Sequence, residues 1–230
     1  MKKVIFSLNI GSYQNYPTIE YFKEYANKCG ADYIGLEKQV VNLPNPFYEK
    51  FYFVELLNEY DRVLYIDSDI IITPWARDIF SHLDDTECFY AFPENFDLPI
   101  MDRDICVKPF LEKYPDWPRQ VNGKLQYFNA GVFLTSKKHQ KEFMRFRDIP
   151  KMEGVFEDDD QNYLNYLIVS KKIPFKSLPF SFNRMHLGQS DPNNLRYMAD
   201  FIHYAGNKDF YGNESKDLTI LKDLNKLYVK

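Results

Sequence analysis

Residues 61–73, DRVLYIDSDIIIT, constrain this chain more than any other stretch. The first half is a short apolar run rich in strand formers, which predicts a buried strand of an α/β sheet. Asp67 and Asp69 stand at the end of that run, and apolar residues follow them. Side chains two positions apart on an extended backbone point to the same side, so the two carboxylates would lie together.

Two neighbouring carboxylates need a positive partner if they are buried. Burying them unpaired costs several kcal/mol each, and the simplest partner is a hard divalent cation, which prefers oxygen ligands. The alternative is a polar strand end that faces solvent, because a bare Asp-x-Asp is common among proteins. The apolar residues on both sides of the pair favour the metal site.

Length and composition fit a single globular domain. The 230 residues are 45% hydrophobic and 27% charged, which allows a sizeable core. The net charge of −4 gives no basic footprint, so no nucleic-acid partner is expected. No run is long enough to predict a membrane span. The three cysteines show no metal-ligand spacing and fit free thiols of a reducing compartment, so a cytoplasmic location is expected.

Strands and helices are expected to alternate along the chain. Residues 4–10 predict a first strand, 18–28 a helix that stops at Gly30, and 32–36 a second strand. This β-α-β rhythm predicts a Rossmann-like sheet. No G-x-G-x-x-G follows the first strand, so a nicotinamide or flavin dinucleotide is not expected. Later helices are predicted over 47–60, 75–83, 137–147, 157–170 and 218–224, and later strands over 88–92, 127–134 and 178–183. The last notable segment is 201–208.

Several features allow two interpretations. Lys50 borders the apolar stripe of the predicted helix over 47–60, so it either extends to water or meets an anion above the sheet. The proline-containing segment 93–126 is either a lid or acceptor-binding region, or a structural excursion. The acidic cluster at 157–160 opens a helix, where the helix dipole alone favours acids. The lysines of the closing helix would allow peripheral contact with anionic lipid, although a packed terminal helix is the simpler interpretation.

Motifs in one fixed order span almost the whole chain. They are Lys50, Asp67-Ser68-Asp69, Phe128-Asn129-Ala130-Gly131-Val132, Asp160-Gln161 with Asn165, and His203 with Gly206. In this order they resemble the motifs of GT-A fold glycosyltransferases of the glycogenin and bacterial lipooligosaccharide α-galactosyltransferase type. Leu178-Pro179-Phe180 with Asn183 is similar to the late strand of that family.

The resemblance implies one GT-A domain, Rossmann-like, with a mixed and mostly parallel sheet flanked by helices. Residues 1–92 would form the nucleotide- and metal-binding half, and 93–230 the acceptor and donor-sugar half. The implied reaction moves a hexose from a UDP-sugar to a sugar or glycan hydroxyl, with retention of anomeric configuration, as in glycan biosynthesis. The implied partners are a nucleotide-sugar donor and a carbohydrate acceptor.

The resemblance also implies a role for individual residues. Asp67, Asp69 and His203 would bind Mn²⁺ or Mg²⁺, and an imidazole beside carboxylates favours Mn²⁺. The alternative for His203 is a hydrogen-bonded core histidine. Asp160 and Gln161 would be catalytic, stabilising positive charge on the donor sugar. Donor contacts would come from Asn9 and Tyr13 near the uridine, Ser68 at the ribose, Lys50, Asn129 and Ala130 around the sugar, and Gly206 and Lys208 at the diphosphate. Lys208 stands two residues after Gly206, where the family spacing is three.

Rival functions come from other classes. A haloacid-dehalogenase-like phosphatase also carries Asp-x-Asp after an apolar strand, but its pair lies near the start of the chain, and Ile71 stands where a threonine is usual. A nucleotidyltransferase would need a glycine-rich, lysine-containing loop after the first strand, which the sequence lacks. A non-catalytic sugar-nucleotide-binding module would not need the metal pair.

Overall fold

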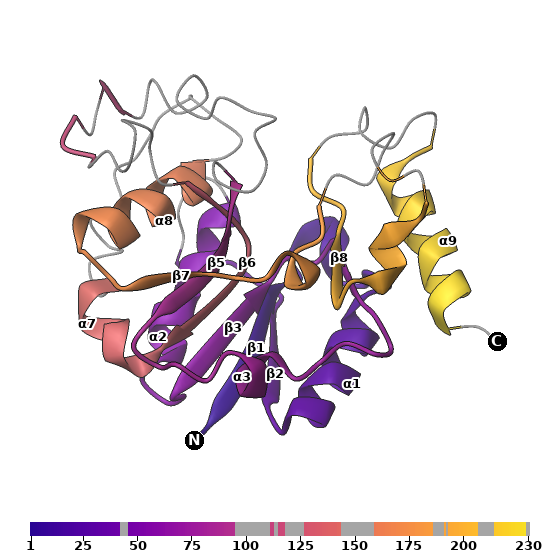
Figure 1. Cartoon of the computed structure of the whole chain (residues 1–230), viewed down its shortest axis with the longest axis horizontal. Coiled ribbons are helices and arrows are strands. Elements are labelled where there is room, and N and C mark those ends of the chain that lie inside the picture. The colour runs from indigo at the N-terminus through magenta and orange to yellow at the C-terminus, as the bar shows by residue number, and fades with distance from the viewer. Residues whose placement is uncertain are drawn as a thin grey trace.

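The computed structural model describes residues 1–41, 46–94, 111–112, 115–117, 127–143, 159–185, 191, 193–206 and 214–228. The strands are β1 (Lys3–Leu8), β2 (Asp32–Leu36), β3 (Arg62–Ile66), β4 (Ile70–Ile72), β5 (Phe89–Pro93), β6 (Phe128–Ser136), β7 (Phe175–Ser177) and β8 (Phe201–His203). The α-helices are α1 (Ile19–Cys29), α2 (Phe53–Leu56), α3 (Ile79–His82), α7 (Gln140–Phe143), α8 (Asp159–Ser170) and α9 (Lys216–Tyr228). Figure 1 shows their arrangement.

The described strands form a large sheet and a small one. The large sheet has six strands in the order β2–β1–β3–β6–β5–β7, and the small sheet pairs β4 with β8. In the large sheet β6 runs antiparallel to both of its neighbours, while the remaining pairs are parallel. The predicted mixed, mostly parallel sheet with flanking helices is therefore confirmed.

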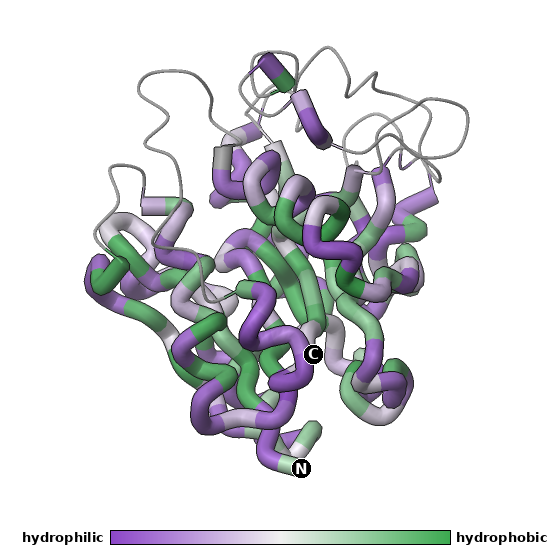
Figure 2. The backbone as a smooth tube through the Cα atoms, turned by 90° about the vertical axis from the view of Figure 1, so that its left-hand side faces the viewer, coloured by the Kyte–Doolittle hydropathy of each residue, from purple (hydrophilic) through white to green (hydrophobic). Residues whose placement is uncertain are grey.

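Helices cover both faces of the large sheet. Val63 and Tyr65 of β3 join the apolar core under α2 and α8, whereas Leu64 and Ile66 join the core under α1 and α3. This alternation follows from the two-residue period of a strand. In Figure 1 α2 and α8 lie to the left of the strands and α1 to the right. Figure 2 shows the hydrophobic stretches gathered in the interior strands, with hydrophilic stretches at outer turns.

The segment with the two aspartates is split between the sheets. β3 ends at Ile66 and β4 begins at Ile70, so Asp67 and Asp69 stand in the short connection. β4 leaves the large sheet and pairs antiparallel with β8, where Ile70 lies opposite His203. One core covers Ile70 and Ile72, while Ile71 on the opposite face packs with residues of α9. The connection therefore lies where the two sheets meet.

Two predicted elements are wrong. The helix over 47–60 is a 3-10 helix, η2 (Pro46–Tyr52), followed by the short α2. With about three residues per turn the apolar stripe shifts, so Tyr48 is buried and Phe47 is 49% exposed. The strand over 178–183 is the 3-10 helix η6 (Phe180–Phe182), and the strand of this region is the earlier β7. Pro179 precedes η6 and has no N–H to give to a sheet.

Other boundaries also differ from the predictions. The helix expected over 75–83 is α3 alone, which begins after Asp78, whose carboxylate accepts a bond from the Phe80 N–H. The helix expected from residue 137 begins as the 3-10 helix η4 (Lys137–His139) before α7. Most of segment 93–126 and residues 157–158 lie outside the described residues. Cys29 and Cys88 are free thiols, and Cys106 is outside the described part.

The fold adds little evidence about membrane contact or about the cellular location of the protein. Among the described helices, none has the length and apolar character needed to cross a membrane. α9 is a packed helix, since Ile220 and Leu224 are buried against the small sheet. Peripheral membrane contact and a cytoplasmic location stay predictions.

Candidate active site

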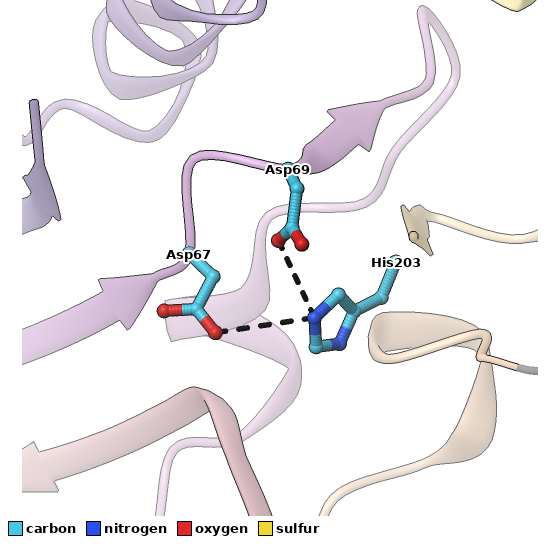
Figure 3. Close-up of side chains that lie close together, drawn as sticks. All are labelled: Asp67, Asp69 and His203. Atoms are coloured by element: carbon cyan, nitrogen blue, oxygen red, sulfur yellow. Dashed lines mark ion pairs between the residues drawn. The ribbon is translucent and has the colours of Figure 1, made fainter. Parts of the chain in front are cut away.

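Asp67, Asp69 and His203 come together at the junction of the two sheets. Each offers one ligand atom, and these atoms lie within 4.8 Å of one another. The His203 Nε2 is 3.9 Å from Asp67 Oδ2 and 3.4 Å from Asp69 Oδ1, as the dashed lines in Figure 3 mark. Asp69 Oδ1 is buried and has no hydrogen-bond partner among the described residues. A buried carboxylate oxygen of this kind, facing a ring nitrogen, fits a cation site.

A chain of hydrogen bonds fixes which nitrogen of His203 faces the carboxylates. The Gly131 N–H donates to Asn129 Oδ1 at 2.9 Å, so this atom of Asn129 is the amide oxygen. The same oxygen accepts a bond from Asn183 Nδ2 at 3.0 Å. Asn183 Oδ1 is then the acceptor for His203 Nδ1–H at 2.7 Å. Because Nδ1 donates, Nε2 is the atom left for a ligand. Histidine ligands in proteins are oriented in this way.

Replacing Asn183 with alanine is expected to weaken Mn²⁺ binding about 10- to 100-fold, because the ring of His203 loses its acceptor. Calorimetric titration of the protein with Mn²⁺ measures this directly. Asn58→Ala, which removes an exposed amide, is the matched control and should leave the affinity unchanged. Wild-type affinity in Asn183→Ala would show that the amide does not orient the ligand.

Gly131 makes room for the cluster itself. A Cβ at this position would lie 2.7 Å from Asp67 Oδ2 and would also clash with His203 Cε1. The backbone N–H of Asp67 in turn donates to the Gly131 carbonyl at 2.8 Å. Gly131 therefore lies against two of the side chains predicted to bind the metal, and no larger residue fits there.

Lys50 lies buried between two carboxylates. Its Nζ is 2.5 Å from Asp160 Oδ2 and 3.9 Å from Asp67 Oδ1, and the side chains of Lys50 and Asp160 are each 6% exposed. Of the two interpretations, the lysine does not extend to water but meets anions above the sheet. The Tyr65 hydroxyl also donates to Asp67 Oδ1, at 2.5 Å. Burial and the Asp67 charge raise the pKa of Tyr65, so the hydroxyl stays protonated.

Gln161 joins the start of α8 to β6. Its Oε1 accepts bonds from the Ala130 N–H at 2.8 Å and from Asn129 Nδ2 at 3.3 Å, and its Nε2 donates to the Tyr127 hydroxyl. One turn later, Asn165 bonds both the N–H and the carbonyl of Phe128. These amide hydrogen bonds hold the start of α8 against β6, the strand that carries Asn129. Asp160 and Gln161 therefore lie on the side of β6 that faces the cluster of Asp67, Asp69 and His203.

The residues predicted at the nucleoside are engaged with the scaffold. Asn9 is buried and bonds Ser7 and the Tyr33 hydroxyl. The Ser68 hydroxyl donates to the Leu8 carbonyl. Tyr13 is partly exposed at the end of the 3-10 helix η1 (Gly11–Tyr13), and its pKa is raised by burial.

The residues predicted at the diphosphate are described only in part. Gly206, with a φ of 90°, adopts a backbone conformation that favours glycine. Lys208 lies outside the described residues.

Sequence reasoning missed three contributors. Tyr65 stands two positions before Asp67 on the same face of the strand, a signal that was present in the spacing. Asn183 was noted only as part of a motif, and its bond to His203 depends on the fold. Lys216 forms an ion pair with Asp69 from the distant α9, and no local pattern announces it.

Comparison with known proteins gives a family match and many similar folds. Residues 15–209 match glycosyl transferase family 8. No curated protein matches the sequence. A glycosyltransferase involved in glycosylation of the major capsid of PBCV-1 is 16% identical with a TM-score of 0.61, over 96% of this chain and 100% of that one.

Two further enzymes with known structures extend the comparison. The galactosyltransferase LgtC, solved with donor and acceptor sugar analogues, is 16% identical with a TM-score of 0.50, over 99% of this chain and 97% of that one. The glycosyltransferase GlyE of Streptococcus pneumoniae is 16% identical with a TM-score of 0.52, over 98% of this chain and 64% of that one. At such identities the likeness concerns the fold, and it agrees with the mixed sheet described above.

Proposed function

Because the chain belongs to glycosyl transferase family 8, we propose that it transfers a hexose from a UDP-sugar to a hydroxyl of a sugar or glycan. That it is a glycosyltransferase of GT-A fold follows from the family and the fold. The nature of donor and acceptor, the metal dependence and the stereochemistry are the proposed part. The observation that carries the proposal is the cluster of Asp67, Asp69 and His203, with Nε2 turned toward both carboxylates.

The donor set of this cluster fits Mn²⁺ or Mg²⁺. Two carboxylates and one imidazole favour Mn²⁺ over Mg²⁺, and when bound the ion would neutralise the diphosphate that leaves the donor sugar. Asp67, Asp69 and His203 would hold the ion. Tyr65 and Lys50 hold Asp67 in place through its other oxygen, Oδ1.

Asp160 and Gln161 are proposed to face the donor sugar, with Lys50, Asn129 and Ala130 beside it. The Asp160 carboxylate is paired with the Lys50 ammonium, and the Gln161 oxygen already accepts two bonds. Neither group is therefore a strong nucleophile, and an amide is a poor base in any case. Their charge and dipoles can stabilise a cationic sugar, which favours attack of the acceptor on the face that the diphosphate leaves.

We expect an α-linked donor to give an α-linked product. Front-face attack retains the anomeric configuration, and the arrangement of Asp160 and Gln161 suits it better than base-assisted inversion. Proton NMR of the anomeric signal in the product decides this. A β-linked product would refute retention and require a base among the acids at 158–160.

The direct test of the whole proposal is a panel of nucleotide sugars with added Mn²⁺, followed by donor hydrolysis and by calorimetric titration with UDP. A transferase should bind UDP only with the ion and hydrolyse one donor slowly. Binding without turnover of any donor would instead indicate the non-catalytic sugar-nucleotide-binding module. Phosphate release from simple phosphate esters would indicate the phosphatase, with Asp67 as nucleophile.

A further inference from the structure

The terminal helix α9 reaches the metal cluster through its first residue. Lys216 forms an ion pair with Asp69 Oδ2, while Asp69 Oδ1 faces His203. The side chain of Lys216 is only 20% exposed. α9 begins beyond residue 209, where the match to the family ends. A helix beyond the residues matched by the family thus supplies a cation to one of the two aspartates.

α9 is held in place by a buried carboxylate in its middle. Asp223 accepts bonds from Arg196 at 2.7 Å, from the Tyr197 hydroxyl at 2.5 Å and from the Tyr204 hydroxyl at 2.5 Å. Tyr204 directly follows His203, and its N–H donates to the Asp69 carbonyl at 3.1 Å. The same few residues therefore fix both the cluster and the helix that carries Lys216.

The two ends of α9 are tied to the site as well. The Tyr228 hydroxyl donates to the Ile72 carbonyl of β4. At the other end, the Tyr16 hydroxyl donates to Asp217 at 2.6 Å, and the Tyr16 ring contacts that of Tyr13. The first two residues of α9 thus lie between the aspartate pair and the loop predicted at the nucleoside. Lys216 has little of the freedom of an ordinary surface lysine.

Lys216 presents its ammonium to Asp69 from a largely buried position. A cation held by Asp67, Asp69 and His203 would share Asp69 with this ammonium, and the two positive charges would repel.

A nucleoside diphosphate would offset the repulsion between the bound cation and the Lys216 ammonium. Two carboxylates balance one divalent ion, so a diphosphate brings negative charge that needs a further cation. Lys50 is paired with Asp160. The expected diphosphate lysine, Lys208, departs from the family spacing and is outside the described residues. Lys216 is a charged lysine whose place beside the metal cluster the structure gives.

We propose that Lys216 is a donor-binding residue supplied by α9, whose ammonium opposes binding of a divalent cation alone and favours binding of the cation together with a diphosphate. This inference rests on the proposed function, since it assumes a nucleoside diphosphate donor. It makes binding of the metal and of the nucleotide cooperative, because the diphosphate relieves the repulsion between ion and ammonium.

The test is a pair of calorimetric titrations on the full chain and on Lys216→Met. In the first, Mn²⁺ is added alone, and the variant should bind it about threefold more tightly, because a repelling charge is gone. In the second, UDP is added at saturating Mn²⁺, and the variant should bind it about tenfold more weakly, because a charge-assisted bond is lost. Opposite changes of the two affinities are the signature of the proposed role.

Two further variants make the result decisive. Lys222→Met removes a lysine from the exposed side of the same helix, where it pairs with Glu214, and should change neither affinity. Lys216→Arg keeps the charge and should bind UDP within about threefold of wild type. If Lys216→Met does not fold, Lys216→Gln takes its place in both titrations, and Lys216→Arg remains the charge-retaining comparison.

Each other result overturns the inference. Weakening of both affinities would show that Lys216 only supports the fold, and two unchanged affinities would show that it has no part in the site. If the wild type itself does not bind UDP in the presence of Mn²⁺, both the proposed function and the proposed contact between Lys216 and the diphosphate are wrong. The Mn²⁺ titration still measures the repulsion at Asp69 in that case, so the two failures are distinguishable.

Discussion

Asp69→Asn is expected to abolish Mn²⁺-dependent UDP binding and to lower the transfer rate by about 10³-fold or more. The amide keeps the shape of the side chain but removes the charge that the ion and Lys216 both use. Metal stabilisation of a leaving group contributes several kcal/mol to the transition state, which corresponds to a rate factor of this size. Calorimetry with UDP, with and without Mn²⁺, and a transfer assay measure the two losses.

The control for this variant is Asp61→Asn, in the same stretch of sequence. Asp61 is exposed and accepts a bond from the Lys2 backbone N–H. Its loss should leave UDP binding and transfer near wild type. The metal-site assignment would be wrong if Asp69→Asn still bound UDP more tightly with Mn²⁺ than without it.

Lys50→Met is expected to lower the free energy of unfolding by about 3–5 kcal/mol, because it removes the ammonium partner of a buried carboxylate. For a chain of this length that corresponds to a melting temperature lower by about 10 °C. Thermal denaturation followed by circular dichroism measures the change. Lys50→Met combined with Asp160→Leu should recover much of the stability, because both buried charges are then gone, but it should not recover transfer.

Lys23→Met is the matched control for the buried pair. Lys23 pairs with Glu20 on the surface of α1, where both side chains are at least half exposed. Exposed pairs of this kind contribute about 1 kcal/mol or less. Equal melting temperatures of Lys50→Met and Lys23→Met would show that the contact with Asp160 contributes nothing to the fold.

The core of the site was predictable because its chemistry is local. Asp67 and Asp69 are two residues apart after an apolar run, and that pattern predicts β3 with the two carboxylates at its end. Both aspartates stand in the connection after β3 and not on a strand, so strand alternation does not explain why they lie together. His203 is far away in the sequence, so only its resemblance to a family motif suggested it. Its place beside the aspartates comes from the pairing of β4 with β8, which neither strand specifies alone.

Other parts of the site depend on tertiary contacts that no short pattern contains. The helix predicted over 47–60 fails at its start, where the chain forms the 3-10 helix η2, yet this is the segment that buries Lys50 against Asp160. Helix periodicity gave the right neighbourhood for Lys50 but the wrong geometry. No sequence pattern predicts the contact of Lys216, because its partner Asp69 lies far away in the sequence, in the connection between β3 and β4.

The register of the small sheet has a consequence for how this protein holds its shape. A slip of β8 by one residue would turn His203 to the face where Ile202 now packs on α9. An ion held by Asp67 and His203 would therefore link the end of β3 in the large sheet to β8 in the small sheet. Separation of β8 from β4 would then require loss of the ion. Ion binding and closure of the small sheet become a single equilibrium, in which the ion concentration sets how often this corner of the molecule opens.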